Sequence, residues 1–132
     1  MKERTKDYYV NQGYSCSESI VRAAIDEGLC PKELLPCATT FSGGMSQGCL
    51  CGTIAGSQIV LGYNFGRENT KGNEVTARQK AAEFLEEFKK RNKFTCCRIL
   101  SKDVPSENKK AHCSKFVSDA AEILESMLKV KV

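Results

Sequence analysis

Residues 42–66 read S-G-G-M-S-Q-G-C-L-C-G-T-I-A-G-S-Q-I-V-L-G-Y-N-F-G, and they hold seven of the chain's ten glycines. The longer run 34–66 contains no Asp, Glu, Lys or Arg, whereas charged residues are frequent before and after it. A charge-free segment inside a charged chain is typical of a buried element that other elements cover. From Cys49 onward the stretch is long enough for about four helical turns, so it predicts a central helix that begins near Gly48.

Three glycines of this stretch recur every four residues, at Gly48, Gly52 and Gly56. On a helix this spacing places them in one row. Each glycine in a helix interior costs about 0.5–1 kcal/mol relative to alanine, so the row needs a reason. A smooth groove that another backbone or a bulky group can approach closely is that reason, and we predict that Gly48, Gly52 and Gly56 bind a cofactor.

The patterns outside this stretch predict helices on both sides of it. Apolar residues recur with helical spacing in four segments, which are residues 2–12, 16–27, 74–92 and 107–129. Residues 32–35 and 95–100 predict short helical turns, and no segment alternates as a strand does. We therefore predict an all-α fold in one domain, residues 1–132, built as a compact helical bundle of four or five main helices around the central Gly-rich helix.

Composition excludes several classes of function. The net charge is +4 and lysines alternate with glutamates, so no basic patch indicates a nucleic-acid partner. The charge-free run is a poor membrane span, because Thr53, Ser57, Gln58 and many glycines interrupt it. The start, M-K-E-R-T-K-D-Y-Y, has no apolar signal core, which favours a cytoplasmic protein.

Eight cysteines are the unusual feature of this composition. In a reducing compartment, cysteines bind metals or carry redox chemistry more often than they form structural bridges. Ser15 and Glu18 have the spacing of a capping box, which makes Cys16 the first residue of its helix. Cys51 lies near the start of the central helix. At both positions the helix dipole is expected to favour the thiolate, which makes these cysteines candidate nucleophiles.

Four separated stretches also resemble a family pattern. They are N-Q-G-Y-S-C-S-E-S at 11–19, C-G-T-I-A-G at 51–56 followed by Leu61-Gly62, C-R-I-L at 97–100, and Cys113 with F-V-S-D-A-A at 116–121. In cysteine order, glycine motif and length, nearly the whole chain is similar to the C_GCAxxG_C_C family of putative redox-active proteins. The resemblance implies a small helical protein with four signature cysteines, which here are Cys16, Cys51, Cys97 and Cys113.

Two details of the resemblance matter for the site. Thr53 stands where the family usually has alanine, and Cys96 competes with its neighbour Cys97 for the signature role. The related split-Soret cytochromes attach haem covalently, but this chain lacks C-x-x-C-H, so covalent c-type haem is not expected.

Three hypotheses remain for the four signature cysteines. They could be metal ligands, and an iron–sulfur cluster fits their dispersed positions better than zinc does. Alternatively, two of them could cycle between dithiol and disulfide, with Cys16 or Cys51 attacking and Cys97 or Cys113 resolving.

The third hypothesis gives the cysteines only a packing role in a helical binding or scaffold module, because cysteine is often a buried hydrophobe. The sequence does not decide whether the protein is an enzyme. It names neither the cofactor nor the redox partner, and it leaves a homodimer open.

Overall fold

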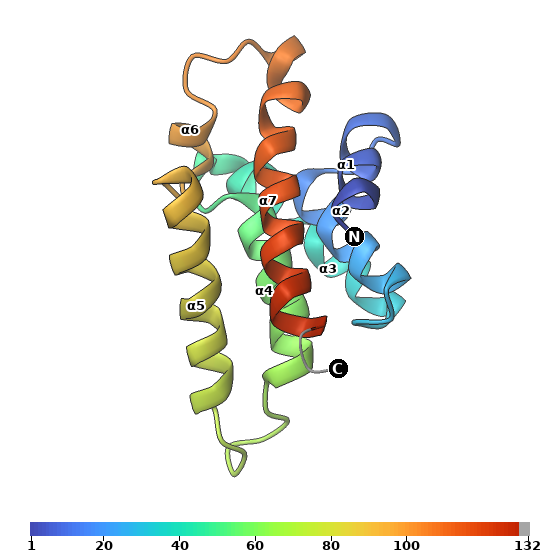
Figure 1. Cartoon of the computed structure of the whole chain (residues 1–132), viewed down its shortest axis with the longest axis vertical. Helices are drawn as coiled ribbons and strands as arrows, with labels where there is room; N and C mark the ends of the chain where they lie inside the picture. The colour runs from blue at the N-terminus through green and yellow to red at the C-terminus, as the bar shows by residue number, and fades with distance from the viewer. Residues whose placement is uncertain (130–132) are drawn as a thin grey trace.

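The computed structural model describes residues 1–129, and within them the chain is all-α, as predicted (Figure 1). The seven α-helices are α1 (Lys2–Asn11), α2 (Cys16–Asp26), α3 (Leu35–Thr39), α4 (Gly52–Phe65), α5 (Val75–Asn92), α6 (Cys97–Leu100) and α7 (Lys109–Lys129). Three short turns, η1 (Lys32–Leu34), η2 (Gly44–Gly48) and η3 (Ser106–Asn108), connect them. The last three residues of the predicted domain lie outside the described part.

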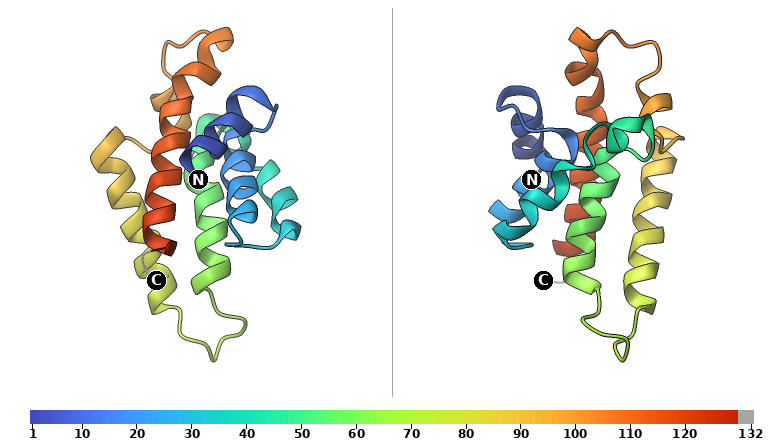
Figure 2. Two further views of the ribbon diagram at one scale, coloured as in Figure 1. Left: turned by 45° about the vertical axis from the view of Figure 1, so that its right-hand side comes forward. Right: turned by 180° about the vertical axis from the view of Figure 1, so that it is seen from behind.

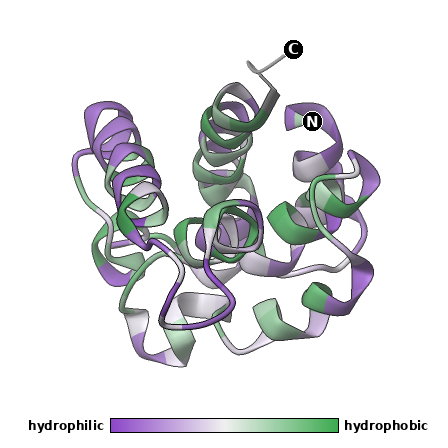
Figure 3. Cartoon of the chain, turned by 90° about the horizontal axis from the view of Figure 1, so that it is seen from below, coloured by the Kyte–Doolittle hydropathy of each residue, from purple (hydrophilic) through white to green (hydrophobic). Residues whose placement is uncertain are grey.

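Helix α4 is central, as the charge-free stretch predicted. It contacts α2 and α3 on one side and α5 and α7 on the other. Helices α4, α5 and α7 run side by side along the long axis, and the N-terminal helices α1 to α3 pack against them (Figures 1 and 2). The apolar sides of the helices face one another and the polar sides face outward (Figure 3). Fully buried side chains from several helices form the core, among them Ile20, Ile54, Phe84, Phe88 and Leu124.

The start of the central helix was predicted wrongly. Helix α4 begins at Gly52, so Gly48 lies outside it and does not continue the row of Gly52 and Gly56. The reason is the backbone before the helix, where Gly43, Gly44, Met45 and Ser46 have φ between +57° and +62°. This left-handed turn, which costs about 1–2 kcal/mol for each residue other than glycine, cannot continue into a right-handed helix.

Gly52 and Gly56 face α2 along the closest helix contact. A Cβ atom at Gly56 would lie 2.5 Å from Cγ2 of Ile20 and 2.7 Å from the carbonyl oxygen of Ser17. A Cβ atom at Gly52 would overlap the Sγ atom of Cys16. The close approach that the glycine row predicted therefore exists, and the group that approaches is helix α2.

We expect Gly56→Ala to lower the free energy of unfolding by about 1–3 kcal/mol, because the added methyl group overpacks the contact between α2 and α4. Gly62→Ala is the matched control on the same helix, since nothing lies within 4 Å of its added Cβ. That exchange should stabilise the protein by about 0.5–1 kcal/mol. Urea unfolding of both variants measures the difference, and equal effects would show that this contact tolerates a side chain.

Candidate functional site

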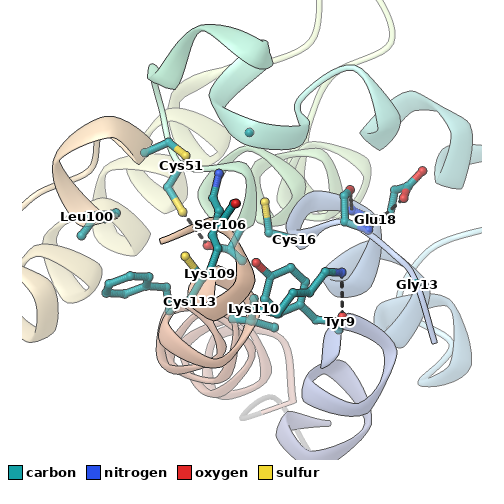
Figure 4. A pocket seen from close by; sticks show the side chains of 16 residues that line it. Tyr9, Gly13, Cys16, Glu18, Cys51, Leu100, Ser106, Lys109, Lys110 and Cys113 are labelled. Atoms are coloured by element: carbon teal, nitrogen blue, oxygen red, sulfur yellow. Dashed lines mark hydrogen bonds between the residues drawn. The ribbon is translucent and has the colours of Figure 1, made fainter. Parts of the chain in front are cut away.

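One cavity of about 400 Å³ is lined by all four signature cysteines (Figure 4). It lies where the start of α4 and the short helix α6 meet α2 and α7, with Tyr9 of α1 at its wall. Cys16 begins α2, Cys51 directly precedes α4, Cys97 begins α6 and Cys113 lies in α7, so the four thiols come from four separate segments. The convergence of these four side chains is the main feature of the site.

Cys16 is placed by the start of α2. The Ser15 side chain accepts a hydrogen bond from the backbone N–H of Glu18 at 3.3 Å, and the Glu18 carboxylate accepts one from the Ser15 N–H at 3.0 Å. This is the predicted capping box, and it makes Cys16 the first helical residue. The Cys16 side chain points into the cavity and lies against Gly52 of α4.

Cys51 and Cys97 are placed by a short antiparallel pairing of the segments before α4 and α6. The backbone N–H of Cys51 donates to the carbonyl oxygen of Thr95 at 2.7 Å, and that of Cys97 donates to Cys49 at 2.6 Å. Leu50 and Cys96 form an isolated bridge between these two bonds. The pairing joins two segments whose bonded residues are 44 to 48 positions apart, so the sequence pattern alone did not predict it.

Cys113 lies in the second turn of α7 and is buried, as its helical spacing predicted. It lines the cavity together with Tyr9, a buried residue of α1 whose side chain acts against burial to lower the pKa of this thiol. Sequence reasoning did not include Tyr9 in the site. No motif marks it, because a tyrosine on an amphipathic helix is ordinarily a packing residue.

Burial raises the pKa of three cavity thiols. The pKa of Cys51 rises from its ordinary 9.0 to about 11, and a hydrogen-bond contact of 3.0 Å with the Thr53 hydroxyl offsets only part of this effect. Burial also raises the pKa of Cys16, partly offset by the backbone N–H of Gly43, and the pKa of Cys113. The expected preference for thiolate at Cys16 and Cys51 was therefore wrong, because loss of hydration outweighs the helix dipole.

The other four cysteines do not line the cavity. Cys37, Cys49 and Cys96 are exposed, and Cys30 is buried elsewhere, where burial raises its pKa to about 11. Exposure of Cys96 leaves Cys97 as the member of the vicinal pair that reaches the cavity. All eight cysteines are free thiols in this structure.

The sequence predicted a cofactor role for three glycines and a metal-binding role for the four signature cysteines. Gly48, Gly52 and Gly56 do not line the cavity, and the nearest glycines that do are Gly43 and Gly13. A cofactor role for that row stays a prediction, although contact with α2 already explains Gly52 and Gly56. Among residues 1–129, no three cysteine, histidine or carboxylate side chains are arranged around a position for a single metal ion.

The fold and the cavity together define a small all-α protein with a thiol-lined site. The family model described as "Putative redox-active protein (C_GCAxxG_C_C)" matches residues 14–127. The chain belongs to this family, which confirms the resemblance noted in the sequence. No curated protein and no solved structure matches the chain. Within the described residues, no helix combines the length and the apolar character that crossing a bilayer requires.

The raised pKa of Cys51 predicts a loss of stability in alkaline solution. The unfolded chain releases this proton above about pH 9, whereas the folded protein holds it up to about pH 11. The free energy of unfolding should therefore fall by up to about 2.7 kcal/mol between these pH values, at about 1.36 kcal/mol per pKa unit.

Urea unfolding of the reduced protein from pH 8 to pH 11 measures this fall. Cys51→Ala should remove the share that Cys51 contributes, and Cys37→Ala, at an exposed thiol, should keep the wild-type pH dependence. The same pH dependence in Cys51→Ala and in wild type would show that Cys51 ionises normally in the fold.

Proposed function

We propose that this family member is a thiol-based redox protein, and that its working site is the cavity formed by Cys16, Cys51, Cys97 and Cys113. The observation that carries the proposal is that these thiols, from four elements, line one cavity. Cysteines buried only as small hydrophobes would lie at unrelated places in the core, and Cys30 is an example of a cysteine buried away from the cavity. We infer a cytoplasmic location, where thiols stay reduced and available for this chemistry.

The reaction is the conversion of two cavity thiols into one disulfide. It breaks two S–H bonds, forms one S–S bond and passes two electrons to an acceptor, with two protons released. A stabilised thiolate favours the reduced form and makes a couple oxidising. Burial raises the pKa of Cys16, Cys51 and Cys113, so these three thiols gain no such stabilisation of the thiolate. We therefore expect a couple without the oxidising shift that a stabilised thiolate gives.

The cavity walls suit this chemistry in two further ways. The Tyr9 side chain lines the cavity with Cys113 and acts against burial to lower the pKa of this thiol, which favours the thiolate that attacks. The short pairing of residues 49–51 with 95–97 is the only contact that ties Cys97 to the start of α4 through backbone hydrogen bonds in the described chain. Movement of α6 by a small amount would change how close Cys97 comes to the other sulfurs.

We expect mild oxidation by diamide, which takes up the two electrons and two protons, to remove two of the eight free thiols, and peptide mapping to link two of the four cavity cysteines. Serine variants of Cys16, Cys51, Cys97 and Cys113 identify the pair, because two of them should abolish the reversible disulfide. Cys37→Ser and Cys49→Ser, at exposed positions, are the controls and should keep it. Oxidation confined to exposed cysteines would overturn the proposal and favour the structural role of a binding or scaffold module.

A second candidate function is supported by the donor set itself. Four thiols are soft ligands of the kind that iron–sulfur clusters use, and such clusters accept ligands from separate elements. The cavity is wider than a site for a single ion, so a group of several atoms fits it better. When bound, an iron–sulfur cluster would supply one-electron transfer. Cys16, Cys51, Cys97 and Cys113 would hold it, and each of them would first lose its proton.

Anaerobic purification followed by iron and sulfide analysis separates the two candidates. A cluster predicts stoichiometric iron and sulfide with visible absorption, which any one of the four serine variants should diminish and Cys37→Ser should preserve. A colourless protein without iron, in which the reversible disulfide forms, would exclude the cluster and leave the thiol mechanism.

A further inference from the structure

Three charged side chains line the cavity in addition to the thiols: Glu18, Lys109 and Lys110 (Figure 4). Two ammonium groups and one carboxylate leave the walls with an excess of one positive charge when the cysteines are protonated. The sequence patterns gave no role to any of these charges at the site. The contacts that each side chain already makes determine which of the three charges is available to bind a ligand.

Glu18 and Lys110 are held by the fold. The Glu18 carboxylate accepts hydrogen bonds from the Ser15 backbone N–H at 3.0 Å and from the Thr39 hydroxyl at 2.7 Å. The Lys110 ammonium donates to the carbonyl oxygens of Tyr9 and Tyr14, each at 2.8 Å. The charge of Lys110 also lowers the pKa of Glu18, so the two charges compensate each other.

Lys109 differs from both of them. Its side chain is half-buried and lines the cavity, and none of the carboxylates in the described residues forms an ion pair with it. Its positive charge acts on the thiols of Cys16 and Cys113, where it opposes the effect of burial on their pKa. Burial prevails at both thiols, so they remain neutral and do not balance the ammonium group.

We propose that the cavity admits a small anionic disulfide, and the thiol formed from it, with the Lys109 ammonium as the counter-charge of its carboxylate. The inference rests on the proposed thiol redox function and names the class of its reactant. A cavity of about 400 Å³ has the size of sites for small organic molecules, and it is too small for a folded partner. A ligand without negative charge would leave Lys109 half-buried and unpaired.

The reaction with such a disulfide, RS–SR, has two steps. A cavity thiol beside Lys109, Cys16 or Cys113, attacks one sulfur, forms a protein–SR disulfide and releases the other half as RSH, which takes the proton. A second cavity thiol then displaces the bound half and gives the protein disulfide and a second RSH. Two protein thiols are oxidised and one small disulfide is reduced, so electrons and protons balance.

Three small disulfides of similar size test the charge preference in the reduced full-length protein. They are dithiodiglycolate with two carboxylates, bis(2-hydroxyethyl) disulfide without charge, and cystamine with two ammonium groups. Each rate of cavity-thiol loss is divided by the rate with a neutral model thiol, which removes the reagent's own reactivity. We expect dithiodiglycolate to exceed the neutral disulfide by roughly tenfold, with cystamine slowest, since a charged cleft raises the on-rate of its counter-ion.

Lys109→Met should reduce this preference to near unity, and Lys109→Arg should preserve it. Lys102→Met is the matched control, because it removes the same charge from an exposed position that does not line the cavity. An unchanged preference in Lys109→Met, or an equal loss in Lys102→Met, would overturn the inference. Equal reactivity of all three disulfides with the wild-type protein would overturn it as well.

A second pair of reagents separates this inference from the proposed redox function. Iodoacetate and iodoacetamide alkylate thiols irreversibly and differ mainly in charge, so they require no disulfide. A preference for iodoacetate at Cys16 and Cys113 that disappears in Lys109→Met supports anion admission even if no reversible disulfide forms. The absence of this preference, with reversible disulfide formation intact, would overturn the anionic reactant and leave the redox function standing.

Discussion

The close contact between α2 and α4 is the constraint on which the rest of the structure depends. Gly52 and Gly56 allow the two helices to approach until the backbone of Ser17 and the side chain of Ile20 touch α4. This approach carries Cys16, at the start of α2, to the start of α4, where Cys51 lies. A side chain at either glycine would separate the helices, and the distance between these two sulfurs would increase with them.

A second constraint acts at the same end of the bundle. The left-handed turn at Gly43, Gly44 and the two residues after them reverses the chain before α4, and the following residues pair with the segment before α6. A Cβ atom at Gly44 would lie 2.6 Å from the backbone nitrogen of Cys49 and 2.9 Å from Cβ of Cys97. The strained turn is therefore packed directly against the pairing that holds Cys97 at the cavity, which is a reason to accept its energetic cost.

Burial and charge act in opposite directions at this site. Burial raises the pKa of Cys16, Cys51 and Cys113 and so favours the protonated thiols. Reaction requires a thiolate. The groups that favour it are the Gly43 N–H at Cys16, the Thr53 hydroxyl at Cys51 and the Tyr9 side chain at Cys113, and the Lys109 ammonium group acts on both Cys16 and Cys113. A reactant that places its negative charge beside Lys109 would lie next to Cys16 and Cys113, the two thiols on which this ammonium group acts.

The sequence by itself determined the all-α class, the central position of the charge-free helix, the capping box before Cys16 and the burial of Cys113. These features follow from local patterns, namely charge, helical periodicity and the spacing of Ser15 and Glu18. Only the tertiary structure decided that α4 begins at Gly52, that Cys97 rather than Cys96 reaches the cavity, and that Tyr9 and Lys109 belong to the site. Burial reverses the expected effect of the helix dipole on the pKa of Cys16 and Cys51. The sequence could not show this, because loss of hydration depends on every neighbouring helix of the packed molecule and not on a local segment.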